Sequence, residues 1–130
     1  MAPQINRVGD LTIFVERPES PNGKPPVLLI HGMFGGAWYW EEYQAFLAQR
    51  GYESHAMNLR GHHGSRPVRD IGKVSLGDYV ADALEVAAAL KNPIVIGHSM
   101  GGLIAQKVGR SLRLETEAHL RCIAKFLQTA

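Results

Sequence analysis

The stretch Ile94-Val95-Ile96-Gly97-His98-Ser99-Met100-Gly101-Gly102 decides the fold of this chain. It begins as a short β-branched run, passes through a Gly-x-Ser-x-Gly motif and continues into an apolar, helix-compatible segment. A strand that turns sharply into a helix around a central serine is a nucleophile elbow. Gly97 and Gly101 carry no Cβ, so neither would collide with a neighbouring element in such a tight turn. The N-terminus of the following helix would favour negative charge developing beside Ser99.

Upstream of this turn, the chain repeats the pattern of a short apolar run followed by a loop. Residues 27–30 have the composition of a strand that is covered on both faces, and they lead into a glycine-rich loop at residues 31–36. Residues 52–57 predict the next strand, and a long loop follows at residues 58–67. A first strand is expected within residues 5–15.

Helical patterns alternate with these strands. Aromatic and leucine residues at helical spacing predict a helix over residues 38–50, which Gly51 would end. A second helix is predicted over residues 75–90. Ser75 and Asp78 can form a capping box at its start, and its apolar residues lie on one face.

After the serine turn we expect a helix over about residues 101–108, stopped by Gly109, and a tail helix over about residues 112–128. The alternation of strands and helices predicts an α/β fold with a mostly parallel sheet flanked by helices. Right-handed crossovers bring the carboxyl ends of parallel strands to a common edge. His31 and Ser99 should therefore face each other across a crevice.

The totals describe an ordinary globular chain. We expect residues 1–130 to form one domain, with 45% hydrophobic and 20% charged residues. A net charge of +2 without basic runs argues against nucleic acid or an anionic membrane as partner. A single cysteine, Cys122, and the absence of a signal-like N-terminus predict a cytoplasmic protein.

Neither a metal nor a cofactor is expected. His62 and His63 are adjacent in sequence, so their side chains point in different directions, and no third ligand stands at a plausible spacing. A solvated loop is the simpler interpretation of this pair.

Residues 29–36, 58–62 and 97–102 together resemble motifs of the α/β-hydrolase superfamily, an esterase/lipase-like group of serine hydrolases. Their order and separations match the N-terminal half of such a protein, over about residues 5–109. The resemblance implies a truncated or minimal α/β-hydrolase fold, and it leans toward small esterases and methylesterases. One departure is Asn58, which stands where an aspartate is common in the family.

The resemblance also assigns roles at the predicted crevice. Ser99 would be the nucleophile, and the backbone N–H groups of Met33 and Met100 would form an oxyanion hole. His31 would brace the loop without exchanging protons. The candidate substrate contacts are Gly32, Phe34 and His98, although packing is the simpler role for His98.

The acid and base of a catalytic triad are not evident. In the family they follow the serine, but the residues after Ser99 contain no aspartate, only Glu115 and Glu117, and one histidine, His119. A serine hydroxyl is a poor nucleophile without a base in hydrogen-bond reach. His119 is therefore the tentative base, with a polar position on the tail helix as its alternative. Asp82 precedes the serine and is interpreted as a solvated helix position.

Three functions stay open from the sequence. The first is a carboxylesterase-like serine hydrolase that cleaves small-molecule esters through an acyl-enzyme on Ser99. The second is a non-catalytic fragment or binding module that lacks the acid and base. The third is a related chemistry, either a hydroxynitrile lyase or a perhydrolase.

A further expectation concerns the edge of the sheet. In the family, further strands continue the sheet beyond the one that carries the serine, and without them the apolar strand at residues 94–96 should be an exposed edge that invites pairing with another chain. We therefore expect a homo-oligomer through this edge, or cover from the tail helix.

Overall fold

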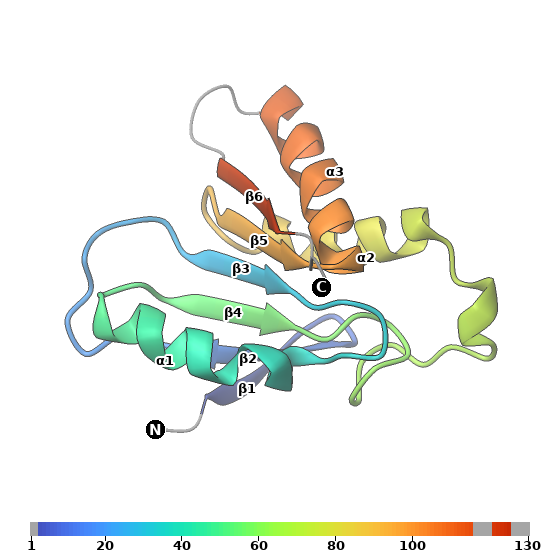
Figure 1. The fold of residues 1–130 in the computed structure, drawn as a ribbon, viewed down its shortest axis with the longest axis horizontal. Helices are drawn as coiled ribbons and strands as arrows, with labels where there is room; N and C mark the ends of the chain where they lie inside the picture. Colours follow the sequence, from blue (N-terminus) through green and yellow to red (C-terminus); the bar gives the residue numbers. More distant parts are fainter. Residues whose placement is uncertain (1–2, 116–120, 126–130) are drawn as a thin grey trace, which may run out of the picture.

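The computed structural model describes residues 3–115 and 121–125, which include a six-stranded sheet in the order β1-β2-β4-β3-β5-β6 (Figure 1). β3 (Val27–Ile30) lies between β4 (Ser54–Met57) and β5 (Ile94–His98) and is parallel to both. β6 (Arg121–Lys125) is parallel to β5. β2 (Leu11–Glu16) is antiparallel to β4 and to β1, which comprises Gln4–Val8. The predicted α/β class with a mostly parallel sheet is confirmed.

The helices follow the predicted order. A 3-10 turn, η1 (Ala37–Trp40), leads into α1 (Glu41–Gln49), and Gly51 beyond it has a φ of +84°. α2 (Leu76–Ala88) starts with the predicted capping box, because the Ser75 hydroxyl and the Asp78 carboxylate each accept from the other's backbone N–H. The bond from Ser75 lowers the pKa of Asp78. α3 (Met100–Glu115) follows the serine turn, and a short 3-10 turn, η2 (Ile71–Lys73), precedes α2.

β3 shows how the layers are built, because its side chains alternate between the two faces of the sheet. Leu28 and Ile30 pack in one apolar cluster with residues of α2 and α3. Val27 and Leu29 pack in a second cluster with residues of η1 and α1. All four are essentially inaccessible, and burying a side chain of this kind contributes roughly 1.5–3 kcal/mol. The sheet is thus a middle layer that places the carboxyl end of β3 beside that of β5 (Figure 1).

Two predicted boundaries were wrong. The first predicted strand is two strands, β1 and β2, because Gly9 adopts a φ of +59° in the tight turn between Val8 and Leu11. α3 also continues past Gly109, which the sequence indicated as its end. Glycine inside a helix costs about 1 kcal/mol, and the packing of the neighbouring Val108 in the core outweighs this cost.

The predicted tail helix is wrong where the structure describes it. Residues 121–125 form β6, whose backbone pairs with the whole of β5, from Ile94 with Arg121 to His98 with Lys125. β5 is therefore not the exposed edge that we expected. The short apolar run around Ile123 suits a strand as well as a helix face, and pairing with β5 decides between them. The remainder of that predicted helix lies outside the described residues.

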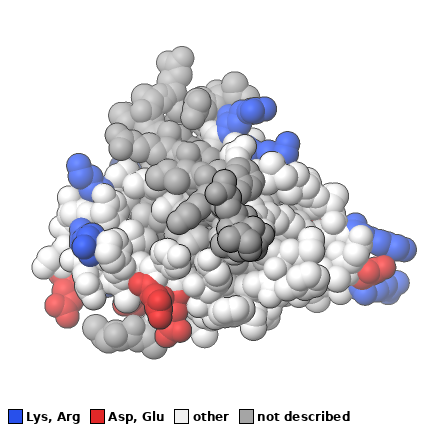
Figure 2. Space-filling model, in the orientation of Figure 1, with Lys and Arg blue, Asp and Glu red and all other residues white. Residues whose placement is uncertain are grey.

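Among the residues that Figure 2 colours, no single large charge patch gathers on the face shown. Acidic and basic side chains lie mostly toward its margins, and the basic ones are spread over several places. Among the described residues, no helix combines the length and apolarity needed to cross a bilayer.

Candidate active site

Ser99 occupies the turn between β5 and α3 in the conformation that the sequence predicted. Its φ is +57°, in the left-handed region that non-glycine residues rarely adopt, and the residue is exposed to solvent. A Cβ on Gly97 would overlap the backbone of Gly101. A Cβ on Gly101 would overlap the carbonyl of Ile30. The two flanking glycines are therefore required by close backbone approach.

The loop of residues 31–36 lies directly against Ser99. Ile30 at the end of β3 is in register with Gly97, so both chains leave the sheet side by side. A Cβ built on Gly32 would lie 3.0 Å from the Cβ of Ser99, and the Gly35 N–H donates to the Gly32 carbonyl at 3.1 Å. The two strand ends therefore meet as predicted, and the crevice between them stays a prediction.

The two predicted oxyanion donors come from the two segments that meet at Ser99. Met100 is the first residue of α3, and the first four N–H groups of a helix have no acceptor within the helix. Met33 and Phe34 are exposed, and Phe34 has a φ of +62°. Left-handed non-glycine residues gather at functional sites, and Phe34 belongs to the loop that lies against Ser99. The roles of Met33, Met100 and Phe34 stay predictions.

His31 is fully buried beneath the loop and is hydrogen-bonded on both ring nitrogens. Leu59 N–H donates to Nε2 at 3.1 Å, so the proton lies on Nδ1, which donates to the Gly32 carbonyl at 2.6 Å. Burial lowers the pKa of His31 to about 4, although the bond to Gly32 acts in the opposite direction. A neutral imidazole with both nitrogens in use suits the expected bracing role.

Asp82 is not the solvated residue that the sequence indicated. Its carboxylate is fully buried and accepts from Arg60 at 2.7 and 2.8 Å and from Arg66 at 2.8 Å. These bonds fasten the loop after β4 to α2, and the bond to Asp82 raises the pKa of Arg60. The spacing of Asp82 in the sequence could have indicated this burial. Asp82 lies three residues after Tyr79 and four before Val86, which places it on the buried face of α2.

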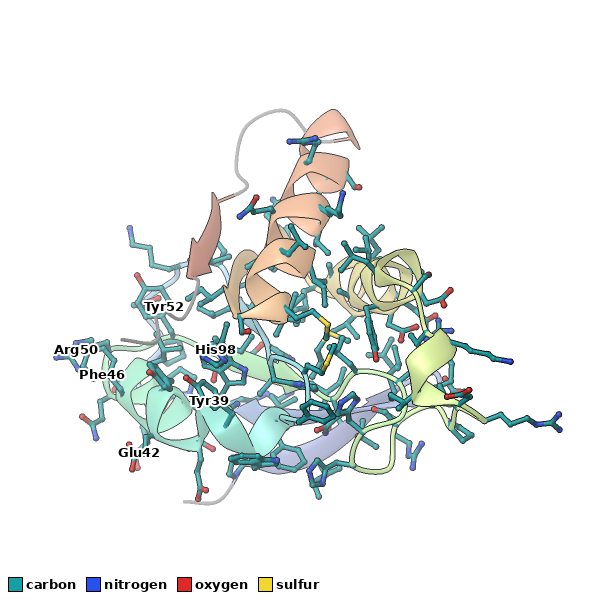
Figure 3. The ribbon with its side chains drawn as sticks, turned by 45° about the vertical axis from the view of Figure 1, so that its right-hand side comes forward. Tyr39, Glu42, Phe46, Arg50, Tyr52 and His98 are labelled. Atoms are coloured by element: carbon teal, nitrogen blue, oxygen red, sulfur yellow. The ribbon has the colours of Figure 1, made fainter. Side chains whose placement is uncertain are left out.

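His98 turns toward α1 and away from solvent. Its ring stacks on Tyr39 with centroids 4.3 Å apart (Figure 3). Both line a pocket of about 250 Å³, whose other walls include Phe46 and Ile96. The Nε2 of His98 and the Nε1 of Trp40 find no hydrogen-bond partner among the described residues. Packing thus accounts for the His98 side chain, and its role as a substrate contact stays a prediction.

The predicted base lies outside the described residues, as do Glu117 and the side chain of Glu115. Within residues 3–112, whose side chains are described, no hydrogen bond joins the Ser99 hydroxyl to another side chain. The same part of the chain holds no group of three or more His, Cys, Asp or Glu residues arranged for a metal ion. The geometry therefore supplies a serine turn and an adjacent loop, and it leaves His119 as a prediction.

Comparison with known proteins agrees with the fold described above. The sequence model of the alpha/beta hydrolase family matches residues 27–124. A putative carbamate hydrolase, RutD, from Azorhizobium caulinodans is 37% identical over 86 residues, which are 64% of this chain and 31% of the relative. A probable esterase, PIR7A, from Oryza sativa subsp. indica is 32% identical over 85 residues, or 63% of this chain and 32% of the relative.

A solved structure extends the similarity to nearly the whole chain. The thioesterase domain from the curacin biosynthetic pathway superimposes with a TM-score of 0.69 at 27% identity, covering 97% of this chain and 44% of that domain. The chain thus spans about a third of the length of the curated relatives described above.

Proposed function

Because this chain belongs to the alpha/beta hydrolase family, we propose that it is a carboxylesterase-like serine hydrolase that cleaves small carboxylic esters through an acyl-enzyme on Ser99. One observation carries the proposal: a left-handed turn exposes Ser99 directly against Gly32 in the loop after β3. Acyl transfer requires such a serine opposite backbone donors. The relative named a probable esterase supports the same substrate class.

The proposed reaction has two halves. The Ser99 hydroxyl oxygen attacks the ester carbonyl carbon, and its proton passes through a general base to the departing alcohol. The N–H groups of Met33 and Met100 receive the negative charge on the carbonyl oxygen. Water then attacks the acyl-enzyme, releases the carboxylic acid and restores Ser99. His119 is the candidate base, because it is the histidine that follows the serine in the sequence.

A fluorophosphonate probe tests the nucleophile, since it forms a stable bond only with an activated serine. The wild type should gain the mass of one phosphonyl group on the peptide that contains Ser99, and Ser99→Ala should gain none. Ser20→Ala, which removes an exposed serine elsewhere, is the matched control and should react like the wild type. A wild type that never reacts at Ser99 would overturn the proposal and favour a non-catalytic binding module.

Assays with different substrates distinguish ester hydrolysis from perhydrolase and hydroxynitrile lyase activity. Hydrolysis of p-nitrophenyl acetate should exceed the background rate and depend on Ser99, and His119→Ala should slow it. Peracid formed from added hydrogen peroxide, or cleavage of a cyanohydrin in the absence of ester hydrolysis, would instead indicate a perhydrolase or a hydroxynitrile lyase.

A further inference from the structure

The loop of residues 31–36 is held at both ends by two adjacent residues that follow β4. At its start, Leu59 N–H donates to Nε2 of His31 at 3.1 Å. Just beyond its end, Ala37 N–H donates to Oδ1 of Asn58 at 2.8 Å. The predicted donor Met33 lies between these two attachments. The position of its N–H therefore depends on where Asn58 and Leu59 hold the ends of the loop.

Asn58 itself is fixed by a fully assigned hydrogen-bond network. Its buried amide donates from Nδ2 to Oγ1 of Thr12 at 3.0 Å. Thr12 uses its hydroxyl proton on the His63 carbonyl at 3.0 Å, so Oγ1 acts as the acceptor toward Asn58. Ser65 donates its hydroxyl to the Asn58 carbonyl at 2.7 Å and accepts from Thr12 N–H at 2.8 Å. With each proton assigned, the amide oxygen of Asn58 must face Ala37.

We propose that Asn58 is a positioning residue, which sets the direction of the Met33 N–H toward Ser99 by accepting from Ala37 N–H. The inference rests on the proposed function, because the direction of that N–H matters for chemistry only if it receives the oxyanion. A backbone donor in an oxyanion hole must lie about 3 Å from the developing charge, and a displacement of about 1 Å can cost roughly 100-fold in rate. Asn58 acts through Ala37 and does not touch the substrate.

Three substitutions around this amide separate positioning from stability. Asn58→Ala removes the acceptor for Ala37, and we expect the rate of Ser99 phosphonylation to fall by about 10- to 100-fold. Asn58→Asp keeps an acceptor for Ala37 but places a second acceptor against Oγ1 of Thr12. It should lower the melting temperature and keep the rate within about threefold of the wild type, as expected from the retained bond. Thr12→Val is the matched control, because it removes the other partner of the same amide.

The pattern among these variants decides the inference. Thr12→Val should lower the melting temperature and keep the phosphonylation rate within about threefold of the wild type, because the backbone bond from Asn58 N–H to the Thr12 carbonyl at 3.0 Å and the bond from Ala37 to Asn58 both remain. The inference that Asn58 positions the loop is wrong if Ser99 is phosphonylated as fast in Asn58→Ala as in the wild type. It is also wrong if the rates of all three variants simply follow their melting temperatures.

Amide hydrogen exchange gives a readout that needs no activity. Exchange at residues 33–36 should accelerate in Asn58→Ala and stay at the wild-type rate in Thr12→Val, because only the first substitution frees the end of the loop. If the wild type never reacts at Ser99, the proposed function fails, but this comparison still decides whether Asn58 positions the loop. Unchanged exchange in Asn58→Ala would overturn the inference.

Discussion

Lowering the pH should destabilise the fold through His31, because this side chain is buried in its neutral form. Its pKa is about 4 in the folded protein and near 6.5 when the chain is unfolded. Between these values the unfolded chain binds more protons, so the free energy of unfolding falls as the pH falls. This contribution is complete above pH 6.5 and is lost progressively toward pH 4. Between pH 7.5 and pH 5 the His31 contribution should decrease by about 2 kcal/mol.

Urea unfolding followed by far-UV circular dichroism at the two pH values measures this loss. His31→Gln is the control, because glutamine keeps a neutral hydrogen-bonding side chain at this position and gains no proton at pH 5. The comparison uses the change in the free energy of unfolding of His31→Gln between the two pH values, and not its absolute stability. All other residues are the same in both proteins, so the difference between the two pH dependences reports on His31. Equal losses in the wild type and in His31→Gln would show that His31 is not held neutral beneath the loop.

Three other perturbations have defined outcomes. Asp82→Asn should lower the free energy of unfolding by about 3 kcal/mol, because it leaves two arginines without their buried charged partner. In the same urea experiment, Glu85→Gln on the surface should lower the free energy of unfolding by about 0.5 kcal/mol or less. Gly101→Ala should lower the free energy of unfolding by more than about 3 kcal/mol, because the added Cβ would overlap the carbonyl at the end of β3. Gly77→Ala is the control in the same thermal melting experiment. Its added Cβ makes only an ordinary contact, so this variant should be more stable than the wild type by about 1 kcal/mol. A homo-oligomer that pairs through a sheet edge would use β1 or β6, the two outer strands of the described sheet, and a monomer in light scattering would reject it.

The sequence was sufficient for the serine turn because its constraints are local. Glycines flanking Ser99 and a β-branched run before it specify the turn without reference to distant residues, and the resemblance supplied the facing loop. The burial of Asp82 needed tertiary information, because a carboxylate on a helix is buried only when arginines from another loop reach it. The hydrogen bonds of Asn58 could not be predicted for the same reason, because its partners Thr12 and Ala37 lie far away in sequence.

The end of the chain shows a different limit. A short apolar run such as that around Ile123 fits both a strand and one face of a helix, and the unpaired backbone of β5 decided the outcome. The general base is harder still to predict. Its position depends on a contact with Ser99 that no local pattern in the residues after the turn specifies.

The most direct test of the central claim compares amide proton and nitrogen NMR spectra before and after phosphonylation. A phosphonyl oxygen occupies the place of the oxyanion and accepts hydrogen bonds from the backbone. We predict that the adduct forms on Ser99 and that the amide protons of Met33 and Met100 both shift downfield. An adduct on another residue, or amide protons that do not move when Ser99 is modified, would contradict the account.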